Sequence, residues 1–187
     1  MRSSDFGSSF QIPKFEAPAE ILLSDNRRLR GKLFLSILSS SKLGHSSVLD
    51  CLNEPQKFFP FLLGESNQVE IINKDVVVSV TVDIKLDQDE GTDILNANLW
   101  IEEIELKCSP YMNLRGNVVL DLPPNKARVL DFFNLTTAFF ALQEGEKHHI
   151  INKRYVTSIK ELSALPPTNV PIVVVKAKRG GRKKKDT

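Results

Sequence analysis

Apolar and polar residues alternate along several short stretches of the chain. The clearest alternations cover residues 28–38, 76–84 and 114–122. Neighbouring side chains of a strand point to opposite faces of a sheet, so a period of two predicts strands with one buried face. Shorter apolar runs bounded by Gly, Pro, Asn or Asp predict further strands over residues 20–24, 58–63, 68–73, 99–108, 139–143, 148–152 and 155–162.

Two short helices are predicted between strands. Val48 and Leu52 lie on one apolar face at helical spacing, Ser47 precedes them as an N-cap residue, and Pro55 prevents continuation. A second helix is predicted over about residues 127–133. Both helices are too short to be stable alone, so each is expected to dock on a sheet.

A set of four sequence blocks occurs twice in the same order, with offsets of 85, 81, 81 and 79 residues. Self-similarity at a nearly constant offset predicts two similar domains in tandem. The first set comprises Leu29-Arg30-Gly31, Val48-Leu49-Asp50-Cys51-Leu52-Asn53, Phe58-Phe59 and Ile71-Ile72-Asn73-Lys74. The second comprises Leu114-Arg115-Gly116, Val129-Leu130-Asp131-Phe132-Phe133-Asn134, Phe139-Phe140 and Ile150-Ile151-Asn152-Lys153.

The repeat and the composition together predict five segments. These are a disordered arm (1–15), a first barrel repeat (16–86), an acidic linker (87–96), a second barrel repeat ending in an extra apolar strand at 171–175 (97–175), and a basic disordered tail (176–187). The expected fold is mainly β, with two tandem five-stranded barrels that each carry one inserted short helix.

The overall composition is that of a globular protein, with 41% hydrophobic and 26% charged residues. No apolar run approaches the roughly 20 residues that a membrane-spanning helix needs, and the N-terminal stretch lacks the apolar core of a secretory signal. A cytoplasmic location is therefore expected. Cys51 and Cys108 occupy unrelated positions of the two repeats and are expected to be reduced thiols.

The net charge of +2 is unevenly distributed. The tail is so basic that residues 1–175 carry about −4 without it, and such a block of like charge is typical of an interaction arm. Phosphate backbones, an acidic membrane surface or an acidic protein groove would all attract it, and a solubilising role fits equally well. Its basic residues are Lys176, Lys178, Arg179, Arg182, Lys183, Lys184 and Lys185.

Two further sequence features occur in both repeats. Each Arg-Gly pair places Gly31 or Gly116 on the inward phase of a strand, which indicates a bend or a close backbone approach. Asp50 with Asn53, and their counterparts in the second repeat, form either a ligand site or the two ends of a helix.

Each repeat resembles the small Sm-like or SH3-like barrels. The resemblance rests on Leu29-Arg30-Gly31 with Asn73-Lys74 and on Leu114-Arg115-Gly116 with Asn152-Lys153, and it covers most of both repeats. The inserted helix departs from the family pattern, the family's N-terminal helix is absent, and its uridine-contacting residues are not recognisable. The resemblance implies that Lys74 and Lys153 stand where Sm-like proteins contact nucleic acid.

No set of residues predicts catalysis, a metal site or a cofactor. His148 and His149 are adjacent on a predicted strand and therefore point to opposite faces, which disfavours binding of one metal ion. Neither a glycine-rich phosphate loop nor a nucleophile elbow occurs.

We therefore expect a non-enzymatic binding or adaptor protein, or a subunit of a protein assembly, with a protein partner or further copies of itself. The alternative is an RNA- or DNA-binding protein of the Sm-like kind. Its candidate contacts to nucleic acid or anions are the basic residues of the tail together with Arg30, Lys74, Arg115 and Lys153.

Overall fold

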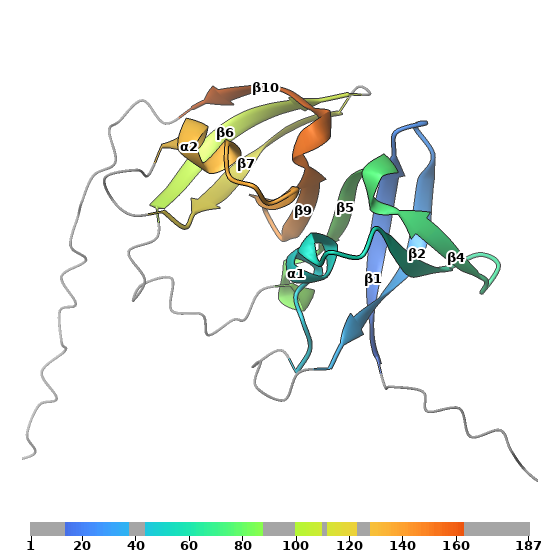
Figure 1. The fold of residues 1–187 in the computed structure, drawn as a ribbon. Coiled ribbons are helices and arrows are strands. Elements are labelled where there is room, and N and C mark those ends of the chain that lie inside the picture. The colour runs from blue at the N-terminus through green and yellow to red at the C-terminus, as the bar shows by residue number, and fades with distance from the viewer. Residues whose placement is uncertain (1–13, 38–43, 88–99, 110–111, 123–127, 163–187) are drawn as a thin grey trace, which may run out of the picture.

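Ten antiparallel strands form one continuous sheet in the computed structural model, which describes residues 14–37, 44–87, 100–109, 112–122 and 128–162 (Figure 1). The strand order is β10-β6-β7-β8-β9-β5-β1-β2-β3-β4. The strands of the N-terminal half are β1 (Lys14–Leu23), β2 (Arg28–Ser36), β3 (Phe58–Leu63), β4 (Val69–Asn73) and β5 (Val77–Asp83). Those of the C-terminal half are β6 (Trp100–Cys108), β7 (Met112–Leu120), β8 (Phe139–Glu144), β9 (Lys147–Asn152) and β10 (Val156–Glu161).

Two α-helices lie between the strands, α1 (Val48–Asn53) and α2 (Val129–Phe133). Both halves have the order strand, strand, α-helix, strand, strand, 3₁₀ turn, strand. The 3₁₀ turns of this pattern are η1 (Lys74–Val76) and η4 (Lys153–Tyr155), and a further turn, η2 (Ile84–Leu86), follows β5. Within the described ranges, no helix has the length and apolar character needed to cross a membrane.

The mainly β prediction with two short helices is confirmed, but the sheet is open and does not close into two barrels. Its two edges are β4 and β10. β5 pairs with β1 of its own half and with β9 of the other half, from Ser79 opposite Ile151 to Asp83 opposite Lys147. The edge of β5 that would close the first half on itself is therefore occupied by β9, as Figure 1 shows at the centre of the molecule.

The first strand begins earlier than the sequence indicates. Residues 20–24 form the apolar run, but β1 starts at Lys14 and pairs with β2 from Lys14 to Leu22. Pro18 is tolerated inside it because β5 pairs with β1 only from Glu20 onward, so no second neighbour needs an N–H from Pro18. The predicted arm before Lys14, the extra strand at 171–175 and the basic tail lie outside the described residues.

Both hydrophobic cores contain residues from both halves of the chain. The first core gathers β1–β5 and α1 and also buries Phe139 and Ile150 from β8 and β9. The second gathers β6–β9 and α2 and also buries Leu22 and Val78 from β1 and β5. Because each core is completed by the other half, the two halves depend on each other for stability.

The repeated glycines mark close backbone approaches, as the sequence predicts. A Cβ placed on Gly31 would lie 1.9 Å from the carbonyl oxygen of Leu62, and one on Gly116 would lie 2.3 Å from that of Gln143. β2 can therefore approach β3, and β7 can approach β8, only because these positions have no side chain. The arginine beside each glycine is exposed to solvent.

Candidate functional site

The two halves meet along the paired strands β5 and β9, which we call the seam. At one end of the seam the side chain of Asn152 is buried and donates to the carbonyl oxygens of Lys74 (3.3 Å) and Val77 (3.1 Å). Asn53, at the end of α1, donates from Nδ2 to the carbonyl oxygen of Phe139 (3.1 Å) and accepts from its N–H (3.0 Å). Asn53 is the last residue of α1, in agreement with the helix-end interpretation, and its amide in addition joins the two halves of the chain.

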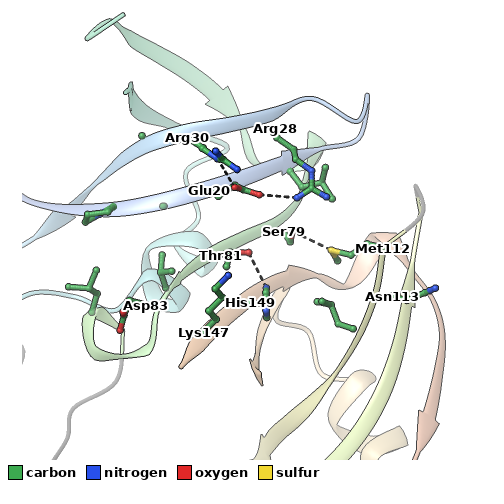
Figure 2. A pocket seen from close by; sticks show the side chains of 17 residues that line it. Glu20, Arg28, Arg30, Ser79, Thr81, Asp83, Met112, Asn113, Lys147 and His149 are labelled. Carbon is green, nitrogen blue, oxygen red and sulfur yellow. Dashed lines mark hydrogen bonds and ion pairs between the residues drawn. The ribbon is translucent and has the colours of Figure 1, made fainter. Parts of the chain in front are cut away.

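A groove of about 710 Å³ runs along one face of the seam, lined by β1, β2, β5, β9 and the start of β7. Figure 2 shows Glu20 between Arg28 and Arg30. Each of its carboxylate oxygens lies 2.9 Å from the guanidinium nitrogen of one of the two arginines. The hydrogen bond from Arg30 is the main reason why the pKa of Glu20 is lowered. Arg30, a candidate anion contact, thus projects over the groove already paired with a carboxylate.

His149 lies on the floor of this groove (Figure 2). Its Nδ1 is 3.0 Å from the Thr81 hydroxyl and its Nε2 is 3.1 Å from Oε2 of Glu144. A neutral ring with the proton on Nε2 satisfies both contacts, since it donates to the carboxylate and accepts from the hydroxyl. Burial lowers the pKa of His149, and the Glu144 carboxylate opposes that effect only in part.

His148 points to the other face of the sheet. Its Nδ1 is 2.9 Å from Oδ2 of Asp87, whose other oxygen accepts the backbone N–H of Val48 at the start of α1. Asp87 belongs to the predicted acidic linker, but its side chain is almost completely buried. The two adjacent histidines thus have separate partners, and no group of three or more His, Cys, Asp or Glu within the described residues has the arrangement of a metal site.

The corner lysines direct their amino groups inward, toward the ends of the two α-helices. Nζ of Lys74 donates to the carbonyl oxygens of Cys51 (2.8 Å) and Glu54 (2.9 Å). Nζ of Lys153 donates to those of Phe132 (3.1 Å) and Leu135 (3.3 Å). A cation at a helix C-terminus satisfies carbonyl groups that have no partner within the helix. Burial lowers the pKa of both lysines.

The remaining candidate contacts are dispersed. Nε of Arg115 donates to Oε1 of Glu103 at 2.9 Å on the outer face of β6 and β7, remote in sequence and strand order from Arg30. The tail residues lie outside the described ranges. The structure brings Lys74 and Lys153 together along one pocket. Arg30 lines the groove at the seam and Arg115 lies on β7, so the four described candidates do not form one basic surface.

Neither cysteine has the environment of a reactive thiolate. Burial raises the pKa of Cys51, and it raises that of Cys108 to about 11. Thiolate nucleophiles require the opposite shift. Both thiols are free, as the sequence predicts.

The apolar side chains at the β4 edge of the sheet are more exposed than those of the seam. On β4 and its neighbour β3, large apolar side chains are exposed to solvent, namely Phe58 at 56%, Val69 at 55% and Ile71 at 63%. The first hydrophobic core covers only the opposite face of this hairpin, through Phe59, Phe61 and Ile72. An edge strand with unpaired backbone groups beside an exposed apolar patch is a suitable site for strand addition.

Comparison of the chain with protein-family models, with curated proteins and with solved structures finds no match. The candidate site therefore rests on geometry alone. The repeated blocks single out Phe58 and Ile71 in the sequence but do not predict their exposure, since the same blocks contain the buried Phe139 and Ile150. The groove has no such signal, because Glu20, Thr81 and His149 come from three separate stretches that only the sheet brings together.

Proposed function

We propose that this protein is a non-enzymatic binding protein that works as a subunit of a protein assembly, and that it binds by strand addition at the open edges of its sheet. The observation that carries the proposal is the exposed apolar patch of Phe58, Val69 and Ile71 at the edge formed by β4. Backbone hydrogen bonds would supply affinity, and the exposed side chains would supply specificity.

The seam supports this proposal because it is itself a strand-addition contact. β9 supplies five residues that pair with β5, and side-chain contacts from Asn53 and Asn152 reinforce the pairing. Tyr155 adds a hydrogen bond of 2.6 Å from its hydroxyl to the carbonyl oxygen of Asp75. The chain thus already uses this mode of binding between its own halves.

We further propose that the halves are two copies of one bent, five-stranded unit of the Sm-like or SH3-like type. Support comes from the repeated sequence blocks, the repeated element order and the repeated glycine contacts. In this interpretation the open sheet results from the last strand of the first unit, β5, pairing with β9 of the second unit.

The test is a site-specific crosslink from the β4 edge. A photoreactive amino acid replaces Ile71 in the full chain, and a matched chain carries it at Glu65, which lies in the exposed turn before β4. Crosslinking in cells followed by mass spectrometry should identify a discrete protein partner, another copy included, from position 71 and not from position 65. Absence of any protein crosslink from position 71 would exclude the proposed function.

A nucleic-acid-binding function is the second candidate, favoured by the seven basic residues among the last twelve. The amino groups of Lys74 and Lys153 donate to backbone carbonyls, and Arg30 and Arg115 pair with carboxylates. The tail would therefore supply the contacts to phosphate, and the affinity would fall steeply with salt.

A further inference from the structure

Each strand of the seam has a counterpart at a free edge of the sheet. The block Ile150-Ile151-Asn152-Lys153 at the end of β9 recurs as Ile71-Ile72-Asn73-Lys74 at the end of β4. β5 and β10 are likewise counterparts, since each follows the 3₁₀ turn of its half and pairs with the first strand of that half. The molecule therefore contains both sides of the seam a second time, at opposite edges of the sheet, where no strand among the described residues pairs with them.

The counterpart residues of the two halves differ in burial. Phe139 and Ile150 are 3% and 0% exposed because they pack against the core of the other half. Their counterparts Phe58 and Ile71 are 56% and 63% exposed. The same residue types at the same positions are thus covered where a neighbouring unit is present and uncovered at the edge. An apolar surface of this kind is suited to a unit like the one that covers Phe139 and Ile150.

The helix side of the seam shows the same difference. Asn53 of α1 binds the backbone of Phe139, whereas its counterpart Asn134 follows α2 and is exposed. Leu49 of α1 packs against the first core, whereas its counterpart Leu130 of α2 is 68% exposed. The C-terminal half therefore leaves Leu130 and Asn134, the counterparts of Leu49 and Asn53, exposed.

We propose that β4 of one copy adds to β10 of a second copy and so repeats the seam between molecules. This inference rests on the proposed function and names the partner as the chain itself. The register of the seam sets Val80 opposite Ile150 and Thr81 opposite His149. Transferred to the counterpart strands, it sets Ile159 opposite Ile71 and Lys160 opposite Glu70.

The transferred register is chemically complementary at both positions. Ile159 and Ile71 form an apolar pair, and Lys160 and Glu70 form a pair of opposite charge where the seam has a hydroxyl–imidazole contact. Directly opposed side chains on antiparallel strands contact each other, so opposite charges favour the pairing and like charges oppose it. Asn134 would bind the backbone of Phe58, as Asn53 binds that of Phe139.

The contact is head-to-tail, because the two surfaces are different and each copy carries both. Such heterologous contacts extend until the rotation between copies closes a ring, or they form an open fibre when it does not close. Every added copy continues the same sheet and leaves one free β4 and one free β10 until closure. Closure would remove both exposed edges.

The test uses the full chain and two charge-reversed variants, Glu70→Lys and Lys160→Glu, in sedimentation equilibrium. The unmodified chain should show masses that are multiples of 21.0 kDa. In either variant alone, like charges face each other at every contact between copies, so association should weaken by about tenfold. In an equimolar mixture of the two variants, opposite charges again face each other at every contact between unlike copies, so association should be restored. The double variant should restore it for the same reason.

Glu65→Lys is the matched control, since it makes the same charge change in the turn before β4 and should leave association unchanged. A chain that remains monomeric at all concentrations overturns the inference, as does an oligomer that neither variant weakens. A crosslink from position 71 to a different protein, together with a monomeric purified chain, would overturn this inference and leave the proposed function standing. Equal unfolding midpoints for the two variants and the control show that the monomers are intact.

Discussion

The side-chain amide of Asn53 forms two hydrogen bonds with the backbone of Phe139, donating to its C=O and accepting from its N–H. The two residues lie in different halves of the chain, 86 residues apart. The pair fixes the helix of one half against the strand of the other.

We predict that Asn53→Ala destabilises the protein by about 1–3 kcal/mol, because two backbone groups at the seam lose their partner. Urea unfolding followed by tryptophan fluorescence and by circular dichroism measures the loss. Asn134→Ala is the matched control, since that side chain is exposed, and it should change monomer stability by less than about 0.5 kcal/mol. Similar losses for the two variants would show that the pair does not stabilise the seam.

Gly31→Ala should cost about 1–3 kcal/mol or prevent folding. The new Cβ would lie 1.9 Å from a backbone oxygen of β3, so the strands must separate to accommodate it. Gly64→Ala provides the comparison, because its nearest backbone contact is 3.3 Å. Thermal unfolding of the two variants measures the difference, and an equal shift in midpoint would contradict the proposed cause.

Lys74→Met should destabilise the protein by about 1–3 kcal/mol, because the carbonyl groups of Cys51 and Glu54 lose a charged donor in a buried setting. Lys57→Met makes the same substitution at an exposed position beside β3 and is the control. Chemical unfolding checks the difference. If the main role of Lys74 were binding of nucleic acid, both variants would be equally stable and only Lys74→Met would lose affinity.

Stability should fall on acidification partly through His149. Its pKa in the folded protein lies below the ordinary 6.5, so the unfolded chain binds the proton more strongly. This contribution is complete above about pH 6.5 and is lost as the pH falls toward the folded-state pKa. Urea unfolding at pH 7.5 and 5.5 should show a smaller acid loss for His149→Gln than for the unmodified chain. An unchanged loss would assign the effect to other groups.

Deletion of residues 176–187 should abolish most of the affinity of the chain for nucleic acid. The salt dependence of binding has a slope of about −0.9 per phosphate contact, so removing the basic residues should flatten it. Fluorescence anisotropy with a random-sequence DNA duplex at several salt concentrations measures both quantities. An affinity and slope that survive the deletion would place the contact on the folded part.

The strands and helices follow closely from the sequence, because period-two alternation and the Ser47 cap are local signals. The structure confirms Ser47 as the N-cap, with its hydroxyl accepting from the N–H of Asp50. The beginning of β1 does not follow, since it contains Pro18 and charged residues and is held by pairing with β2. Local patterns contain no information about such long-range pairing.

The shared sheet is also hidden from the sequence. The block Ile-Ile-Asn-Lys is identical in β4 and β9, yet Ile71 is exposed and Ile150 is buried. Only the neighbour of each strand decides this difference. For the same reason Asp87 suggests a solvated linker residue in the sequence and is instead a buried partner of His148. The candidate site depends on these relationships, so the sequence predicts its residues but not their grouping.

The continuity of the sheet through β5 and β9 also governs how the chain acquires its structure. During synthesis, β5 is complete long before β9 leaves the ribosome, so Val80 and Val82 remain without the side chains that cover them in the first core. The N-terminal half is therefore incomplete until about residue 152 is available. Unfolding should accordingly be a single cooperative transition, and a newly made first half should depend on chaperones to avoid pairing with the wrong strand.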